Sequence, residues 1–144
     1  MDEPLRQARR CLEHADVPVG AAVYGATGDL LGVGRNVREL ENDPAGHAEI
    51  IALREASERI GSWRLDGATL VVTLEPCLMC AGALIQARVG RVVFGAWDEK
   101  AGACGSVWDV VRDRAALHRL EVVAGVREPE CAALLTEFFA GRRD

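Results

Sequence analysis

The chain has 144 residues, of which 27% are charged and 49% apolar, and its formal net charge is −5. This length suits one domain with a buried core, and the composition excludes a largely disordered chain. The net negative charge argues against an indiscriminate nucleic-acid coat but leaves room for a local basic patch. No apolar run approaches the roughly 18 residues of a membrane helix, and the acidic start lacks a secretion-signal pattern. We expect a single soluble domain over residues 1–144 that is cytoplasmic and does not contact a membrane.

The first half of the chain predicts a helix, a β-hairpin and a second helix. An amphipathic pattern with Pro4 in the first turn indicates the first helix, and a glycine-containing turn separates the two strands. A break over residues 43–46 precedes the second helix, which Gly61 ends. The predicted elements are a helix over residues 4–15, strands over 17–24 and 30–35, and a helix over about 47–60.

The second half alternates strands with helices. Its first strand is a continuous apolar run, which indicates burial on both faces of a sheet. Because this alternation is typical of crossover connections, we expect a partly parallel sheet with helices on both sides. The predicted elements are strands over residues 68–74, 91–94 and 120–124, and helices over 76–87, 106–112 and 128–139.

Two short segments, each at the start of a predicted helix, carry metal-binding residue types. Cys77 and Cys80 are three residues apart, so on a helix both sulfurs lie on one face. Pro76 suits the first helical position, and a helix N-terminus lowers the pKa of nearby thiols. Zinc accepts sulfur and imidazole ligands in a tetrahedral array, so His47 supplies a third ligand. Three protein ligands leave one position for water, which is typical of catalytic zinc.

Glu49 lies on the predicted apolar face of its helix, beside Ala52, Leu53 and Ala56. A buried carboxylate costs free energy unless something uses it. Next to zinc-bound water, a glutamate can take a proton and return it to a leaving group. A regular helix would point His47 away from Glu49, so we expect His47 at the very end of the helix, reaching over its N-terminus.

Two other interpretations of the Cys-x-x-Cys spacing remain open. One is a thioredoxin-like redox pair, although such pairs lack the upstream His-x-Glu segment. The other is a closed structural zinc site, although no further cysteine or histidine has a partner at finger-like spacing. The fourth ligand of such a site would have to be Cys11, His14, Cys104, His118 or Cys131. Otherwise these cysteines suit buried structural positions, and these histidines suit surface or helix-cap positions.

The pairing of His-x-Glu with Pro-Cys-x-x-Cys is the zinc-deaminase signature. Beyond it, the sequence resembles the bacterial tRNA-specific adenosine deaminases of the zinc-dependent cytidine/deoxycytidylate deaminase superfamily, over nearly the whole chain. This likeness is more specific than the signature alone, which cytidine, cytosine and guanine deaminases share. The matching stretches are residues 17–21, 43–44, 47–50, 73–83, 91–96, 100–103, 130–135 and 138–139.

The resemblance implies the cytidine-deaminase-like fold, a three-layer α/β/α arrangement with a five-stranded mixed sheet between helices. It also implies a homodimer whose active site borrows residues from both subunits. The implied reaction is hydrolytic deamination of adenosine to inosine at the wobble position of a tRNA anticodon loop, as in an arginine tRNA. The alternative is a deaminase of a free base or nucleoside, such as guanine or cytosine, with the same zinc chemistry.

The resemblance also assigns roles to individual residues. His47, Cys77 and Cys80 would hold one zinc ion per subunit, and Glu49 would be the proton shuttle for zinc-activated water that attacks C6 of the extruded adenine.

Further positions match family residues that contact the nucleic acid. Asn36 matches an asparagine that hydrogen-bonds the purine, and the backbone of Ala48 is implied in a contact with the base. Asp98 matches an aspartate near the sugar of the target nucleotide. Without the resemblance, Asn36 would be a strand-end turn residue and Asp98 a loop residue. The residues that match a C-terminal segment stacking on and steering the anticodon loop are Phe139, Arg142 and Arg143.

Overall fold

The computed structural model describes residues 1–142 and contains a five-stranded sheet in the order β2-β1-β3-β4-β5. Strand β1 is antiparallel to β2 and β3, whereas β3, β4 and β5 run parallel to one another. The predicted mixed sheet is therefore confirmed. Its strands are β1 (Gly20–Tyr24), β2 (Leu30–Arg35), β3 (Thr69–Leu74), β4 (Arg91–Ala96) and β5 (Glu121–Val123).

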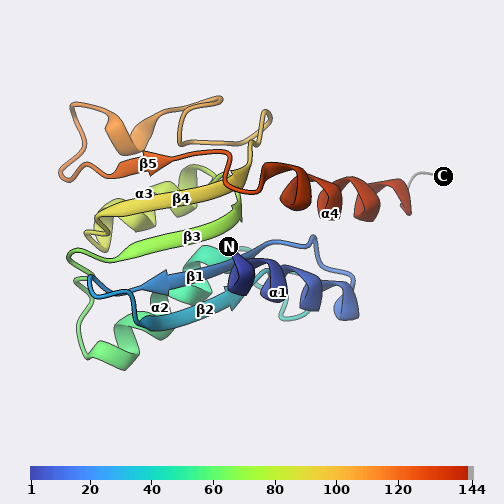
Figure 1. The fold of residues 1–144 in the computed structure, drawn as a ribbon, viewed down its shortest axis with the longest axis horizontal. Helices are drawn as coiled ribbons and strands as arrows, with labels where there is room; N and C mark the ends of the chain where they lie inside the picture. Colours follow the sequence, from blue (N-terminus) through green and yellow to red (C-terminus); the bar gives the residue numbers. More distant parts are fainter. Residues whose placement is uncertain (143–144) are drawn as a thin grey trace.

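Helices cover both faces of the sheet, which confirms the predicted three layers. Helices α2 and α3 lie behind the sheet in Figure 1, while α1 and α4 lie on the opposite face, and α4 extends beyond the strand ends. Within residues 1–142, no helix is long and apolar enough to cross a membrane. The helices are α1 (Asp2–Arg10), α2 (Ala48–Ile60), α3 (Leu78–Gln86) and α4 (Glu128–Ala140), with short 3-10 helices η1 (Cys11–His14) and η2 (Val110–Arg112).

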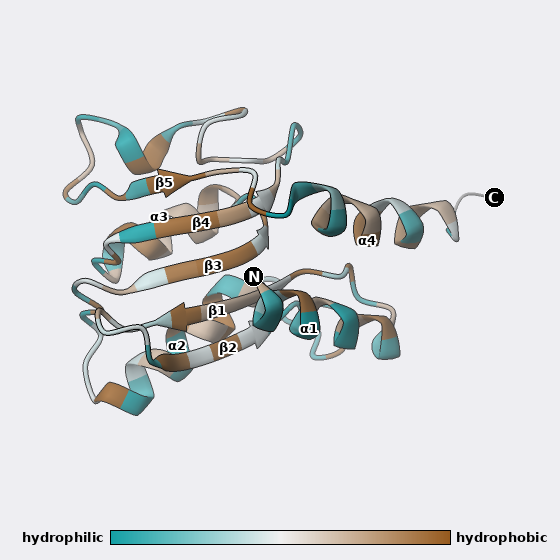
Figure 2. Cartoon of the chain, in the orientation of Figure 1, coloured by the Kyte–Doolittle hydropathy of each residue, from teal (hydrophilic) through white to brown (hydrophobic). Residues whose placement is uncertain are grey.

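The main cluster of buried apolar residues lies where the central strands meet α2 and α3. Figure 2 shows β3 and β4 as mostly hydrophobic ribbons at the centre of the sheet. Residues 70–73 of β3 are all buried, as the continuous apolar run predicted. Phe94 of β4 and Leu84 of α3 are fully buried against this strand pair. The core thus fixes both parallel strands, whose carboxyl ends border the site described below.

Close backbone contact brings the beginning of α2 against the end of β2. A Cβ atom on Gly34 would lie 2.2 Å from the carbonyl oxygen of Ala48, closer than real Cβ atoms come. Only glycine therefore permits this approach. As a result, the N-terminus of α2, with His47 as its N-cap residue, lies beside the residues that follow β2.

Two elements near the N-terminus differ from their predicted bounds. The first helix starts at Asp2, and its final turn tightens into the 3-10 helix η1, which ends at Ala15 with a left-handed φ of 60°. The first strand begins at Gly20 rather than at residue 17, because the Val19 amide donates to the Val17 carbonyl oxygen (2.9 Å) and turns the chain.

Two predicted helices also begin later than expected. Cys77 is the N-cap of α3 with an extended backbone, so Pro76 precedes the helix instead of occupying its first position. The helix predicted over residues 106–112 shrinks to η2 because the amides of Val107 and Trp108 both donate to the Gly102 carbonyl oxygen. Residues 105–107 therefore form a turn and a bend, and Asp109 forms an antiparallel bridge with Cys104.

Candidate active site

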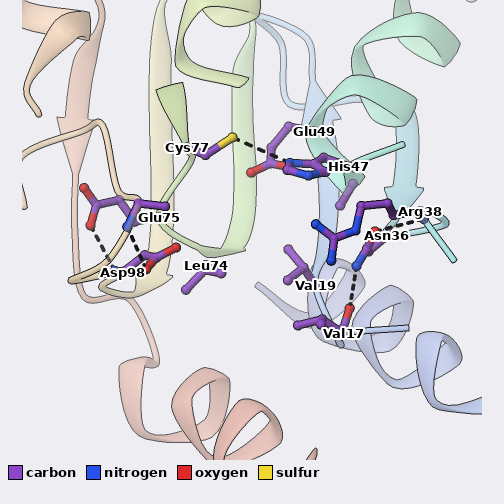
Figure 3. Close-up of a pocket in the computed structure, with 12 residues that line it drawn as sticks. Val17, Val19, Asn36, Arg38, His47, Glu49, Leu74, Glu75, Cys77 and Asp98 are labelled. Atoms are coloured by element: carbon purple, nitrogen blue, oxygen red, sulfur yellow. Dashed lines mark hydrogen bonds between the residues drawn. The ribbon is translucent and has the colours of Figure 1, made fainter. Parts of the chain in front are cut away.

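A pocket of about 230 Å³ lies at the carboxyl ends of β2, β3 and β4. This is the edge where open α/β sheets bind ligands. Figure 3 shows its labelled side chains facing one another from different elements. The pocket unites six of the ten predicted site residues, and its lining is Val17, Val19, Asn36, Arg38, His47, Ala48, Glu49, Leu74, Glu75, Cys77, Asp98 and Ala101.

His47, Cys77 and Cys80 form the group of side chains that can hold a metal ion. Nδ1 of His47 lies 3.6 Å from Sγ of Cys77 and 3.5 Å from Sγ of Cys80. All three ligand atoms lie within 4.8 Å of one another. His47 and Cys77 are the N-caps of α2 and α3, so two helix N-termini meet at the group. The expectation that His47 reaches over its helix end is confirmed.

The local electrostatics favour a thiolate in this group. A hydrogen bond from Cys80 lowers the pKa of the Cys77 thiol, and His47 lowers it further. The thiolate is the form that binds metals. Cys77 is half-buried and Cys80 is fully buried, so the group is open to the pocket on one side.

Glu49 lies directly beside this group. It is the second residue of α2, only 4% exposed, and its Oε2 atom accepts a hydrogen bond from the Cys80 thiol at 3.5 Å. Burial raises the pKa of the Glu49 carboxyl to about 6. A carboxyl group with such a pKa can take up and give back a proton near neutral pH.

Asn36 follows β2 and borders the pocket on the side opposite Asp98 (Figure 3). Its Nδ2 donates to the Val17 carbonyl oxygen (3.1 Å), and its Oδ1 accepts from the Arg38 amide (3.1 Å). Asn36 is therefore a turn residue at the end of a strand, as its sequence position alone suggests, and its side chain also lines the pocket. Since an amide group can donate two hydrogen bonds and accept two, each end can bind one further partner.

Ala48 and Asp98 border the pocket from two different elements. Ala48 is the first residue of α2, where backbone amides have no partner inside the helix. Asp98 follows β4, and its Oδ1 accepts hydrogen bonds from the amides of Lys100 (3.1 Å) and Ala101 (3.2 Å). The loop after β4 is thereby turned toward the pocket.

The C-terminal residues flank the pocket without entering it. Phe139 is 46% exposed and lines a neighbouring groove between α4 and residues 96–101. The guanidinium of Arg142 lies over the Phe138 ring, 3.9 Å from its centroid, and donates to the Ala15 carbonyl oxygen (3.3 Å). The predicted residue Arg143 lies outside the described residues.

The structure does not bring a fourth ligand to the metal-binding group. Among residues 1–142, the three ligand atoms of His47, Cys77 and Cys80 form the only such group, and every cysteine is free. The closed structural zinc site therefore lacks its fourth ligand, and no disulfide framework forms. The candidates for that ligand that stay outside the group are Cys11, His14, Cys104, His118 and Cys131.

Six pocket residues were not predicted from the sequence. Glu75 had a usable signal, because it is an acidic residue directly after a buried parallel strand and directly before the cysteine motif. The remaining ones, which are mostly apolar loop residues without a chemical signal, are Val17, Val19, Arg38, Leu74 and Ala101.

Comparisons with known proteins agree with this geometry. The chain is 43% identical to the tRNA-specific adenosine deaminase of Bacillus subtilis (strain 168) over 139 residues, or 96% of this chain and 86% of that protein. A solved chain from a study of A-to-I editing by tRNA:A34 deaminases superposes with a TM-score of 0.90 at 39% identity, covering 94% of this chain and 97% of that one.

A more distant likeness connects the chain to a purine-base enzyme. A guanine deaminase from Nitrosomonas europaea superposes with a TM-score of 0.78 at 29% identity, covering 95% of this chain and 81% of that one. The sequence model of the MafB19-like deaminases matches residues 1–143. These findings confirm the resemblance inferred from the motifs. The chain belongs to the MafB19-like deaminase family, together with the tRNA-specific adenosine deaminases that it resembles.

Proposed function

We propose that the chain hydrolyses adenosine to inosine at the wobble position of a tRNA anticodon loop. The observation that carries this proposal is a His-Cys-Cys group beside a buried glutamate, on a chain 43% identical to a tRNA-specific adenosine deaminase over nearly its whole length. The residue set His47, Cys77, Cys80 and Glu49 accounts for the hydrolysis, and the surrounding pocket accounts for recognition of the base.

Zinc fits the His-Cys-Cys group. Zinc lies about 2.3 Å from sulfur and about 2.0–2.1 Å from nitrogen, so at the tetrahedral angle its sulfur and nitrogen ligands are about 3.5 Å apart. The two sulfur–nitrogen distances in this chain are 3.6 Å and 3.5 Å. We infer that His47, Cys77 and Cys80 hold one zinc ion per chain, with a fourth position left for water.

Glu49 is the proton carrier in the proposed reaction. Bound zinc supplies the Lewis acidity that makes water nucleophilic near neutral pH. The water oxygen forms a bond to C6 of adenine as the C6–N1 double bond opens, and the proton that leaves the water passes through the Glu49 carboxylate to N1. The Glu49 carboxylate then takes the remaining hydroxyl proton and gives it to the amino nitrogen as the bond from C6 to that nitrogen breaks, which releases ammonia and leaves the 6-oxo base of inosine. Its raised pKa, about 6, suits both steps.

Three pocket residues are proposed to orient the nucleotide. Asn36 offers one further donor and one further acceptor to the purine edge, and the Ala48 amide at the start of α2 offers a donor. Asp98 retains a carboxylate oxygen, Oδ2, that accepts no hydrogen bond within the described part of the chain. This oxygen suits a ribose hydroxyl, which distinguishes RNA from DNA.

Replacing Asn36 by alanine tests its proposed role. We expect kcat/KM for an anticodon stem-loop to fall by about 10–100-fold, because a buried hydrogen bond to the base is lost. The zinc content should stay unchanged. Asn42→Gly is the matched control, since Asn42 is an exposed loop amide at a left-handed φ of 51°. A value of kcat/KM within twofold of the wild type would exclude Asn36 from recognition.

The position of α4 favours RNA over a small free substrate. A C-terminal helix that closed the pocket would suit a small substrate, whereas an open mouth suits a nucleic acid. No residue of α4 lines the pocket among residues 1–142. Figure 1 shows α4 on the sheet face opposite α2 and α3, with its C-terminal part extending beyond the strand ends. We propose that Phe139 and Arg142 contact the loop around the target base, and the resemblance implies the same role for Arg143.

Deamination of a free purine base is the second candidate. The observation that favours it is the superposition with the guanine deaminase of Nitrosomonas europaea at a TM-score of 0.78. The lower identity of that match, 29% against 43%, makes it the weaker candidate.

A substrate panel separates these two functions. Purified zinc-loaded protein is incubated in parallel with an arginine-tRNA anticodon stem-loop, free adenosine, cytidine and guanine. Mass spectrometry then follows the one-dalton gain of deamination. We expect conversion of the stem-loop alone. Conversion of guanine with the stem-loop untouched would overturn the substrate assignment and retain the zinc chemistry.

The chain is also proposed to form a homodimer through the face of α2 and α3. A groove of about 710 Å³ runs between these helices, and the Trp63 side chain beside it is 61% exposed. Leu78 and Met79, which begin α3 next to Cys77, are 51% and 40% exposed. An exposed apolar surface at the site is typical of an interface, and a second copy covering it would border both active sites.

Sedimentation equilibrium tests this assembly. We expect twice the 15.5 kDa chain mass for the wild type. Ala83→Arg, which places a charge in the groove, is expected to shift the protein to the monomer and to lower activity. Glu13→Arg, on the opposite face, is the control. A wild-type protein that sediments as a monomer at micromolar concentration would contradict the homodimer.

The proposal treats residues 1–144 as one deaminase domain, which the match of a single family model to residues 1–143 supports. Because tRNA acts in translation in the cytoplasm, a tRNA substrate implies a cytoplasmic enzyme.

A further inference from the structure

Glu75 is a buried carboxylate that the proposed chemistry does not use. It follows β3 directly, is 1% exposed, and borders the pocket. Among residues 1–142 it forms no ion pair with a basic side chain. A buried charge in such a place is costly unless hydrogen bonds replace its water. The contacts of Glu75 therefore indicate what it does.

Three backbone amides of one loop donate hydrogen bonds to this carboxylate. Oε1 accepts from the Asp98 amide at 3.0 Å, and Figure 3 shows this contact at the edge of the pocket. Oε2 accepts from the amides of Cys104 (3.0 Å) and Ser106 (3.1 Å). Hydrogen bonds to an ionised acceptor are about twice as strong as neutral ones. One side chain thus holds both ends of the loop 98–106.

The same loop packs tightly against Glu75 and against the start of α3. A Cβ atom on Gly102 would lie 2.3 Å from the carboxyl group of Glu75, so the loop needs glycine there. Gly102 also forms an antiparallel bridge with Cys77, and the Ala103 amide donates to the Pro76 carbonyl oxygen at 2.8 Å. Glu75 therefore connects the loop that carries Asp98 to the segment that carries a metal ligand.

We propose that Glu75 is a positioning residue for recognition of the nucleic acid. It fixes the loop 98–106 so that the Asp98 carboxylate faces the pocket opposite Asn36, and it touches neither the reacting base nor the metal ligands' side chains. This inference rests on the proposed function, because it assigns Asp98 to substrate binding. It predicts that disturbing Glu75 weakens substrate binding and leaves the chemical step intact.

Glu75→Gln is a selective test. An amide keeps one acceptor oxygen, which can retain the bonds to Cys104 and Ser106 while the NH₂ group faces the Asp98 amide. The variant therefore releases Asp98 and keeps the other two contacts. We expect KM for the stem-loop to rise about tenfold, because one hydrogen bond that orders the binding loop is lost. We expect kcat within about threefold of the wild type and an unchanged zinc content.

Amide hydrogen exchange measured by NMR supplies a readout that does not depend on activity. In the wild type, the amides of Asp98, Cys104 and Ser106 should exchange slowly, whereas the Glu99 amide, without a hydrogen bond in the described residues, should exchange fast. In Glu75→Gln, only the Asp98 amide should lose protection. Unchanged protection at Asp98 would overturn the positioning role. A wild type with the expected exchange pattern but no activity on the stem-loop would instead refute the proposed function alone.

Two further variants complete the test. Glu58→Gln makes the same substitution at an exposed position of α2, outside the pocket and the neighbouring groove, and should change neither KM nor the exchange pattern. In Gly102→Ala the added Cβ would lie 2.3 Å from both the Glu75 carboxyl group and the Ser106 Oγ atom, so this variant displaces the carboxyl group from its loop contacts and should raise KM with an unchanged zinc content. If Glu75→Gln does not fold, slow wild-type exchange together with a raised KM in Gly102→Ala supports the proposal. Fast wild-type exchange at the three amides, or an unchanged KM in Gly102→Ala, overturns it.

Discussion

Replacing Glu49 by glutamine is expected to lower kcat by about 10²–10⁴-fold, which is the contribution of a positioned proton-transfer group. Glutamine has almost the shape of glutamate, but it cannot take the proton from water or return it to the departing amino group. Glu49 is only 4% exposed and lies beside Cys80. Since glutamine has nearly the same volume and is uncharged, it should occupy this buried position without unfolding the N-terminus of α2.

Steady-state kinetics on the stem-loop and zinc analysis by mass spectrometry check this expectation. Bound zinc per chain and the melting temperature should match the wild type. The control is Glu55→Gln, which makes the same change on the exposed side of the same helix and should leave kcat unaltered. A Glu49→Gln enzyme with full activity would remove Glu49 from the mechanism.

Cys77→Ser is expected to lower both zinc content and activity. A serine hydroxyl is a harder and far less acidic ligand than the Cys77 thiol, whose pKa is lowered by its neighbours. Loss of a hydrogen-bond partner behind a metal ligand already costs about 10–100-fold in affinity, and loss of the ligand itself should cost more. After dialysis against a chelator, the variant should retain little zinc while the wild type keeps one ion per chain.

The matched control for this substitution is Cys11→Ser. Cys11 is also buried, but it lies outside the metal-binding group, and its Sγ contacts backbone carbonyl oxygens to which a hydroxyl can also donate. The control should keep its zinc. Equal zinc content in Cys77→Ser and the wild type would mean that the ligand set is wrong.

Most of the fold could be predicted because its elements carry regular patterns. The run from Leu70 to Val72 is apolar on both faces, and this predicts a central strand in a layered fold. Gly61 ends α2 in a left-handed conformation, as helix-capping rules predict. The metal-binding group could be predicted equally well, because few residue types and spacings can bind zinc.

The conformation of the loop 98–106 could not be predicted, because it does not follow from a regular local pattern. Its shape depends on the Glu75 carboxylate, which lies 23 to 31 residues earlier in the sequence. The local pattern predicted a helix over residues 106–112. Instead, the Ser106 amide donates to Glu75 and the next two amides donate to the Gly102 carbonyl oxygen, so only η2 is helical. The predicted position of Pro76 in the first turn of a helix was also wrong, because Cys77 is the N-cap of α3 and the proline lies outside the helix.

The most direct test of the proposed function maps inosine within a single RNA. An arginine-tRNA anticodon stem-loop is prepared with adenosine at the wobble position and at other loop positions, treated with the zinc-loaded protein, and sequenced, with Glu49→Gln as the blank. The proposed function predicts inosine at the wobble position alone and none in the blank. Inosine spread over the loop adenosines, or an unedited stem-loop under conditions where guanine is deaminated, would contradict it.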